Sequence, residues 1–199
     1  NRKRSGNGDD GSRFVCVTID DFKGQVYSLC KDQHGCRFLQ RQLDLYDVNS
    51  NSHNNNQSSD SNDAASGTKS RPENYAATII FNEIYLHIVE LMTDQFGNYL
   101  IQKLLDQITT KQRITLIKNL SSNFISIALD SHGTRALQKL IDVISTQEEN
   151  LIIIDAFAND IVSLSRDLNG NHVVQKILTK FNYRPENIQF IFDAACEHC

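Results

Sequence analysis

The sequence has no tryptophan, one methionine, two prolines and five cysteines among its 199 residues. Because proline breaks the interior of helices, its scarcity leaves long stretches free to be helical. An odd number of irregularly spaced cysteines argues against a disulfide framework, so we expect reduced thiols. No hydrophobic run approaches membrane length and no signal-peptide pattern opens the sequence. We therefore expect a soluble, cytoplasmic protein that does not contact membranes.

Residues that would hold a metal or cofactor are also scarce. Cys196 and Cys199 have the spacing of half a zinc site, but the sequence offers no second pair of ligands. We expect neither a metal nor a cofactor.

The most informative feature that is present is one phrase that occurs four times. The copies are KDQHGCRFLQRQL from Lys31, TDQFGNYLIQKLL from Thr93, LDSHGTRALQKLI from Leu129 and RDLNGNHVVQKIL from Arg166. Their glycines, which are Gly35, Gly97, Gly133 and Gly170, lie 62, 36 and 37 residues apart. A period near 36 is typical of proteins built from stacked repeats.

Placed on a helix at about 100° per residue, each phrase divides into two faces. With the residue after Gly counted as position 1, positions 1, 2, 5 and 6 share a polar arc. Positions 3, 4, 7 and 8 share an apolar arc, which in the second phrase consists of Leu100, Ile101, Leu104 and Leu105. Because one repeat cannot bury such an arc alone, we expect repeats to stack on both sides of one another.

Further amphipathic runs between the phrases, such as KQRITLIKNL and FISIAL, are long enough to form helices. Together with the phrases they predict an all-α array of three-helix repeats. The segment 79–89 (IIFNEIYLHIV) is rich in β-branched and aromatic residues, which leaves a strand open as an alternative there.

The chain divides into repeats and irregular segments. We expect a flexible N-terminal segment over 1–21, repeat 1 over 22–46, repeat 2 over 76–108, repeat 3 over 109–144, repeat 4 over 145–181 and the start of a truncated fifth repeat over 182–199. Between repeats 1 and 2 lies 47–75, in which 14 of 29 residues are Asn or Ser. Such a composition buries too little apolar surface to fold, so we predict a disordered insert.

The overall charge of −4 does not suggest a polyanion-binding protein, but the distribution of charge does. Across the four phrases, the eight positions after Gly carry +6 and the rest of the chain carries −10. A basic stripe on an otherwise acidic protein predicts a selective groove for a polyanion. The cations at position 6 are expected to contact phosphates, and these are Arg41, Lys103, Lys139 and Lys176.

Position 2 holds a planar side chain in every phrase, and positions 1 and 5 flank it with short or amide side chains. Planar groups at a constant spacing can sandwich bases, and the flanking groups can meet a base edge. The predicted base-binding residues are Cys36, Arg37, Gln40, Asn98, Tyr99, Gln102, Thr134, Arg135, Gln138, Asn171, His172 and Gln175. For any single phrase, an alternative stays open in which Asn and Gln cap helices or satisfy neighbouring groups.

With these residues the sequence resembles the Pumilio (PUF) family of RNA-binding proteins from Phe22 to Cys199, apart from the insert. The resemblance implies a right-handed α-solenoid of three-helix Pumilio-type repeats, curved into a crescent, in which each repeat reads one base of single-stranded RNA. It also implies that Asn-Tyr-Gln and Asn-His-Gln read uracil, and that Cys-Arg-Gln and Thr-Arg-Gln read adenine. With RNA running antiparallel to the protein, repeats 4 to 1 would read 5′-UAUA-3′.

The resemblance further implies binding to 3′-UTR elements of mRNA and post-transcriptional repression or decay, with deadenylase or translational repressor proteins as partners. The chain would then be the N-terminal half of a longer repeat domain. The main alternative is an armadillo- or HEAT-like scaffold for protein interactions. Such a scaffold shares the helices and the repeats, but it needs no planar residue or Gln at matching positions.

One acidic residue precedes each phrase glycine by three positions, and these residues are Asp32, Asp94, Asp130 and Asp167. With the nearby His34 and His132 they resemble acid–base pairs. However, a group that recurs once per repeat is usually structural, and Asp suits the capping of helix N–H groups. We therefore expect no enzymatic activity.

Overall fold

The helices of the chain form a repeating set of three. The computed structural model describes residues 17–53, 74–182, 186 and 188–197. The first helices of the sets are α3 (Tyr75–Ile84), α6 (Thr110–Leu120), α9 (Gln147–Phe157) and α12 (Gln189–Glu197). The short second helices are α1 (Val26–Cys30), α4 (Ile88–Thr93), α7 (Phe124–Leu129) and α10 (Ile161–Arg166). The third helices carry the repeated phrase and are α2 (Gln33–His53), α5 (Gly97–Leu105), α8 (Gly133–Val143) and α11 (Gly170–Phe181).

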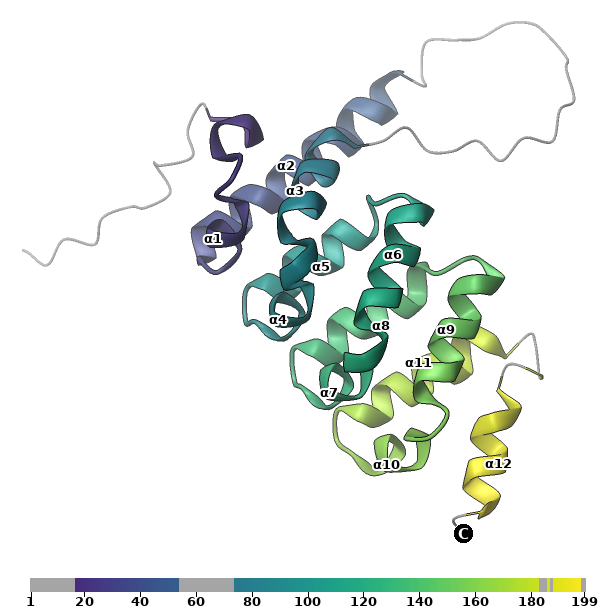
Figure 1. Cartoon of the computed structure of the whole chain (residues 1–199). Coiled ribbons are helices and arrows are strands. Elements are labelled where there is room, and N and C mark those ends of the chain that lie inside the picture. The colour runs from purple at the N-terminus through teal and green to yellow at the C-terminus, as the bar shows by residue number, and fades with distance from the viewer. Residues whose placement is uncertain (1–16, 54–73, 183–185, 187, 198–199) are drawn as a thin grey trace, which may run out of the picture.

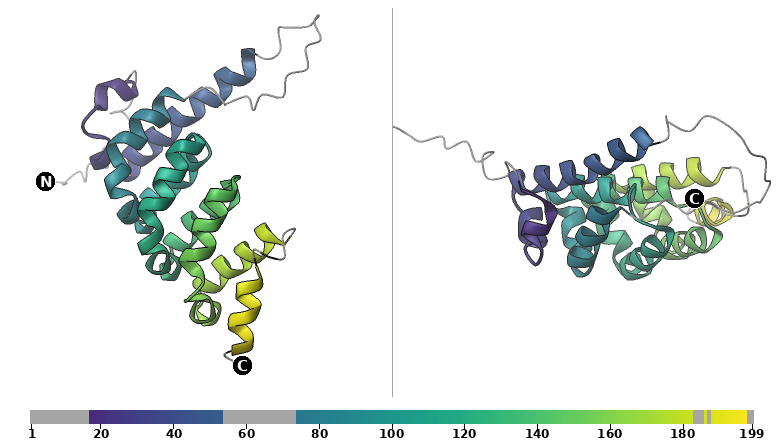
Figure 2. Two further views of the ribbon diagram at one scale, coloured as in Figure 1. Left: turned by 45° about the vertical axis from the view of Figure 1, so that its right-hand side comes forward. Right: turned by 90° about the horizontal axis from the view of Figure 1, so that it is seen from above.

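Equivalent helices lie side by side in chain order, so the molecule is a curved stack (Figure 1). Seen from above, the phrase helices form one layer and the first helices another (Figure 2). The predicted all-α solenoid is confirmed. Residues 79–89, where a strand was the alternative, belong to α3, the 3-10 helix η3 (Tyr85–His87) and α4.

The apolar arc of each phrase helix is the core of the stack. Leu100, Ile101, Leu104 and Leu105 are all at most 2% exposed. Between repeats 3 and 4 the rings of Phe124 and Phe157 stack with their centroids 5.5 Å apart. Burial of a side chain of this size stabilises the fold by roughly 1.5–3 kcal/mol, so contacts between neighbouring repeats hold the array together.

The phrase glycine allows the second and third helices of a repeat to touch. A Cβ atom at Gly133 would lie 2.5 Å from the backbone oxygen of Ile127 in α7. The equivalent distance in repeat 4, from Gly170 to the backbone oxygen of Leu164, is 2.8 Å. Since real Cβ atoms essentially never approach a backbone atom so closely, any larger residue would force the two helices apart.

The recurring aspartates cap the phrase helices. The carboxylate of Asp130 accepts hydrogen bonds from the backbone N–H groups of His132 at 2.8 Å and Gly133 at 2.7 Å. Asp167 accepts from Asn169 and Gly170 in the same way, and those N–H groups, Gly170 first, hold the pKa of its carboxyl below the usual value. The structural role predicted for these aspartates is confirmed.

A buried ion pair joins repeats 3 and 4. The carboxylate of Glu149 is fully buried and accepts from the guanidinium Nε of Arg113, which is 7% exposed. It also accepts from the backbone N–H groups of Ser145 at 2.9 Å and Thr146 at 2.8 Å, which completes a capping box at the start of α9. Burial alone would raise the pKa of Glu149, but Arg113 and the N–H groups lower it below the usual value.

The boundaries of two irregular segments differ from the prediction. The flexible segment was predicted over 1–21, yet the 3-10 helix η2 (Ile19–Phe22) is formed and buries Ile19. The disordered insert was predicted over 47–75, yet α2 continues to His53 and α3 begins at Tyr75. Side-chain composition alone does not reveal where a helix that is already nucleated will end. Residues 54–73 lie outside the described part of the chain, so disorder there stays a prediction.

Repeat 1 packs directly on repeat 2 although a long connection separates them. The carboxylate of Glu83 in α3 accepts from the backbone N–H groups of Gly24 at 2.7 Å and Val26 at 3.1 Å, at the start of α1. The ring of Tyr27 stacks on His87, with 3.9 Å between centroids, and its hydroxyl donates to Glu90 at 2.6 Å. The stack is therefore continuous across the insert.

One described stretch, Tyr75–Thr93, has the length and apolar composition of a membrane span. This corrects the expectation that no run approaches that length. It is divided among α3, η3 and α4, and 44% of it is buried inside the fold. Ile80, Ile84 and Leu91 are completely buried, so packing between repeats accounts for the apolar residues.

Candidate nucleic-acid interface

Positions 2 and 5 of the phrase helices form the exposed polar face that the helical wheel predicts. Tyr99 is 50% exposed, and the planar groups of Arg37, Arg135 and His172 are exposed as well. The glutamines at position 5 lie one turn further along each helix; Gln175 is exposed and the others are half-buried. Each repeat therefore presents one planar group and one amide on the same surface.

Position 1 is buried, contrary to the wheel. Cys36, Asn98 and Thr134 are at most 4% exposed, and Asn171 is half-buried. In repeats 2 and 4 the reason is the turn before the phrase helix, whose backbone oxygens bind the side chain at position 1. In repeat 2 the side-chain nitrogen of Asn98 donates to the backbone oxygens of Asp94 at 2.8 Å and of the next residue at 3.1 Å. An amide donates only two hydrogens, so this asparagine is committed to the turn.

The residue at position 1 in turn orients the glutamine at position 5. Gln102 donates from Nε2 to Oδ1 of Asn98 at 3.1 Å, and Gln138 donates to Oγ1 of Thr134 at 3.3 Å. Gln175 makes the same bond to the asparagine of repeat 4 at 3.4 Å. One N–H and the oxygen of each glutamine are then left for a ligand. The amide at position 5 therefore offers the hydrogen-bonding groups to a ligand, and the side chain at position 1 fixes the orientation of that amide.

Repeat 1 differs in having a thiol at position 1. The Sγ of Cys36 donates to the backbone oxygen of Cys30 at 2.8 Å. Burial, with the carboxylates of Asp94 and Asp32 nearby, raises the pKa of Cys36 to about 12. The thiol is therefore protonated and uncharged at neutral pH, and it offers a mainly apolar surface. The described cysteines, which are Cys30, Cys36 and Cys196, are free thiols.

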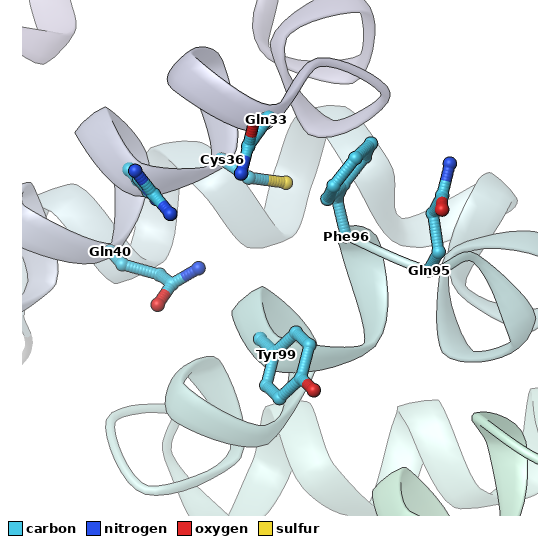
Figure 3. Close-up of a pocket in the computed structure, with 7 residues that line it drawn as sticks. Gln33, Cys36, Gln40, Gln95, Phe96 and Tyr99 are labelled. Carbon is cyan, nitrogen blue, oxygen red and sulfur yellow. The ribbon is translucent and has the colours of Figure 1, made fainter.

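A pocket of about 280 Å³ opens between the phrase helices of repeats 1 and 2. Figure 3 shows Cys36 and Gln40 on α2 and Tyr99 on α5 around it, with the sulfur of Cys36 directed into the space between the helices. The complete lining is Gln33, Cys36, Arg37, Gln40, Gln95, Phe96 and Tyr99. It contains two planar groups of neighbouring repeats and the position-5 amide, which is the arrangement needed to hold a flat base.

Three residues of this pocket were not predicted: Gln33, Gln95 and Phe96. They occupy the two positions before the phrase glycines. The recurring aspartate could have revealed these residues. Its carboxylate binds the backbone N–H groups at the start of the phrase helix, so the residues between the aspartate and the glycine lie beside that helix end.

Two similar pockets follow along the stack. One of about 260 Å³ is lined by Gln40, Tyr99, Gln102, Lys103, Asp106 and Lys139. Another of about 220 Å³ is lined by Gln138, His172, Gln175, Lys176 and Thr179. Eight of the twelve predicted base-binding residues line one of these three pockets, and the other four do not: Asn98, Thr134, Arg135 and Asn171. In the described part of the chain, no group of three or more His, Cys, Asp or Glu side chains could hold a metal ion.

Three of the four cations at position 6 are already paired with carboxylates. Lys103, Lys139 and Lys176 each form an ion pair with an aspartate of the preceding repeat, at 2.5, 2.7 and 2.9 Å respectively. Arg41 is exposed and has no such partner among the described side chains. The predicted phosphate contacts of the three lysines would have to compete with carboxylates that are already in place.

The molecule is an array of helical repeats. Each repeat presents one planar group and one oriented amide, and pockets lie between neighbours. This arrangement defines a class of solenoid proteins that bind single-stranded nucleic acids through their repeats. The family model described as "Pumilio-family RNA binding repeat" matches residues 25–48, 87–121, 123–156 and 160–194. The chain belongs to this family. The matched units start at the short second helix of each repeat, whereas our division starts at the first helix.

Individual relatives agree with the family assignment. Pumilio homolog 12 of Arabidopsis thaliana is 40% identical over 185 residues, which cover 92% of this chain and 26% of that protein. A solved Puf4 RNA-binding domain, bound to the HO endonuclease RNA 3′ UTR recognition sequence, is 51% identical with a TM-score of 0.71; the match covers 88% of this chain and 46% of that domain. The yeast Puf5p domain bound to MFA2 RNA is 34% identical, with a TM-score of 0.67 and coverages of 85% and 40%. The chain thus spans about a quarter of that curated relative and under half of these domains.

Proposed function

We propose that this chain binds single-stranded RNA with one base per repeat and reads 5′-UAUA-3′ with repeats 4 to 1. The observation that carries the proposal is the recurrence, on one surface, of a planar side chain and a glutamine that the neighbouring position 1 orients. The Puf4 and Puf5p domains, which are similar over most of this chain, are bound to RNA. Their likeness supports the RNA-binding part of the proposal.

Uracil suits the repeats with asparagine at position 1. Its Watson–Crick edge has one N–H donor between two carbonyl acceptors. The oxygen of Gln102 can accept from that N–H, and its free N–H can donate to one of the carbonyls. Because Asn98 holds the other N–H, the amide is fixed in an orientation that presents both groups at once. Asn171 and Gln175 would act in the same way in repeat 4.

Adenine suits the repeats with cysteine or threonine at position 1. These side chains are smaller than asparagine, and both use their hydrogen inside the protein: Cys36 donates to Cys30 and Thr134 donates to the backbone oxygen of Asn169 at 3.1 Å. They leave more room for a purine and an apolar contact. The amide of Gln40 or Gln138 can pair with the donor and acceptor on the adenine edge.

The biological setting that we propose is the cytoplasm, where the chain would bind 3′-UTR elements of mRNA and support repression or decay without catalysing a reaction. Deadenylase or translational repressor proteins would be its protein partners. These roles are proposed for the whole protein. The chain itself spans 26% of the Arabidopsis relative and 46% of the Puf4 domain.

A change of specificity tests the readout. The family resemblance implies that Ser at position 1 with Glu at position 5 reads guanine, since a carboxylate accepts both N–H donors of the guanine edge. Asn171→Ser with Gln175→Glu should change the preferred RNA from UAUA to GAUA. The difference in binding free energy between GAUA and UAUA RNA should change by on the order of 1–3 kcal/mol, as for a mismatched base pair in nucleic-acid recognition. Binding is measured with RNA oligonucleotides at one salt concentration.

The matched variant is Asn98→Ser with Gln102→Glu, which carries the same change of charge in repeat 2 and should prefer UAGA. Thermal unfolding of both variants is required, because each loses two hydrogen bonds from asparagine to the preceding turn. If the preference changes at the opposite end of the tetranucleotide, the assumed direction of the RNA is wrong. Equal affinity of the unaltered chain for UAUA and scrambled RNA would instead favour a protein-interaction scaffold.

A further inference from the structure

The lysine–aspartate pairs on the phrase helices form a regular ladder. Each lysine at position 6 reaches back to position 9 of the preceding repeat. The pairs are Lys103 with Asp44, Lys139 with Asp106 and Lys176 with Asp142. A pair that recurs at three successive repeat boundaries follows from the repeat geometry itself and is not an isolated surface contact.

The helical wheel explains why these aspartates lie on the same surface as the planar groups and glutamines of positions 2 and 5. Position 9 is at about 80° from position 1, between positions 1 and 2 of the polar arc. Counting position 9 with the eight preceding positions lowers the charge of the four phrases from +6 to +3. The surface is therefore much closer to neutral than the lysines and arginines alone suggest.

The ladder limits what the lysines can contribute to RNA binding. Their side chains are 35%, 30% and 28% exposed, and the ammonium groups lie within 3 Å of carboxylate oxygens. A phosphate would therefore replace an anion that is already present. In contrast, general RNA affinity comes from cations whose neutralisation of phosphates releases counterions. A lysine that is already paired with a carboxylate adds little to this counterion-release contribution.

At the last step of the ladder, two lysines contact the same aspartate residue. Lys176 contacts the carboxylate of Asp142 at 2.9 Å, and Lys180 donates to the backbone oxygen of the same residue at 2.6 Å. Removal of this carboxylate would leave Lys176 without its partner beside the pocket of repeats 3 and 4, on a helix that also carries Lys180. We expect the largest effect of any single substitution in the ladder here.

On the basis of the proposed RNA binding, we propose that Asp44, Asp106 and Asp142 are specificity-determining residues. By holding the position-6 lysines, they suppress sequence-independent attraction to the RNA backbone. Affinity then depends on the bases that the planar groups and glutamines contact. The lysines act as positioning residues between adjacent phrase helices.

The test compares the unaltered chain with the triple variant Asp44→Asn, Asp106→Asn, Asp142→Asn. Binding to UAUA-containing and scrambled RNA is measured from 50 to 200 mM salt, with thermal unfolding as a check of the fold. Three freed lysines should steepen the dependence of log affinity on log salt by about 2, which is roughly 16-fold across this range. Affinity for scrambled RNA should rise more than affinity for UAUA RNA, so discrimination should fall.

A control variant removes the same charge from the layer of first helices, called the outer layer, on α9 and α12. It carries Glu148→Gln, Asp155→Asn and Asp193→Asn, and it should change the salt dependence much less. A second variant, with Met in place of Lys103, Lys139 and Lys176, should keep the salt dependence of the unaltered chain.

The proposal is overturned if the aspartate variant binds scrambled RNA as the unaltered chain does, or if its effect equals that of the outer-layer control. It is also overturned if the methionine variant loses about 2 from the salt slope, because the lysines would then contact phosphates despite their partners. Failure of the proposed function looks different: the unaltered chain would show no preference for UAUA, whatever the salt slopes are.

Discussion

Replacement of Tyr99 by Ala should weaken RNA binding without unfolding the protein. Tyr99 is 50% exposed and lies off the apolar arc, so truncation leaves the core residues of the helix in place. It lines both the pocket of about 280 Å³ and the next one of about 260 Å³, and its ring can therefore stack on two bases. Stacking on an aromatic side chain contributes about 1–3 kcal/mol per base, which corresponds to a loss of roughly 5- to 150-fold for one base. If both faces stack, the loss should approach the upper end of that range or exceed it.

The assay is fluorescence anisotropy with labelled UAUA-containing RNA, together with thermal unfolding. Tyr99→Phe keeps the ring and should bind nearly as well as the unaltered chain. Leu151→Ala removes a side chain of similar exposure, 54%, from α9 in the outer layer and should leave affinity unchanged. A sharp fall in unfolding temperature, with unchanged affinity per folded molecule, would show that Tyr99 supports the fold and does not stack on bases.

Further predictions concern the fold. Gly133→Ala should destabilise the protein by about 1–3 kcal/mol in urea unfolding, because its Cβ would lie 2.5 Å from the backbone oxygen of Ile127; an unchanged midpoint would refute the close contact. Glu149→Gln leaves Arg113 without its buried partner and should cost about 3–5 kcal/mol, whereas Glu148→Gln, which breaks an exposed pair, should cost less than about 1 kcal/mol. The pKa of Glu149 is below its usual value, so its stabilising effect should be complete above the unfolded-state value of about 4.3 and be lost as pH falls through the folded-state value. Urea unfolding from pH 7 to pH 3 should show this loss, and Glu149→Gln should lack it. Replacement of 54–73 by a short Gly/Ser linker should change unfolding temperature and UAUA affinity little, since closure entropy depends weakly on loop length; a loss of affinity beyond about tenfold would show that the segment contacts RNA.

The repeat period and the two arcs of the phrase were sufficient to predict the solenoid. Apolar residues at positions 3, 4, 7 and 8 can be buried only by stacking, so the sequence pattern determines the packing. The pattern was less informative where neighbouring backbone decides burial. Position 1 lies at the edge of the polar arc, and Asn98 is fully buried because the preceding turn covers it, which a wheel of one isolated helix cannot show.

The charge prediction was incomplete for a different reason. It stopped at position 8, although position 9 returns to the polar arc one residue later. Asp44, Asp106 and Asp142 therefore lie beside the lysines that were assigned to phosphates. Their pairing depends on the offset between adjacent repeats, and that offset is a property of the packed stack that no single phrase contains.

Because repeat 1 packs directly on repeat 2, the number of residues between two phrases does not determine how far apart their binding surfaces lie. Gly35 and Gly97 are 62 residues apart, whereas Gly133 and Gly170 are 37 apart, yet α2 and α5 share a pocket as α8 and α11 do. Because Glu83 and His87 hold repeat 1 in register, the connection can lengthen during evolution at a cost of only about 0.6 kcal/mol per doubling. If each repeat binds one base, as proposed, the spacing between bound bases is set by the packing of adjacent phrase helices, and the number of residues between two phrases can vary.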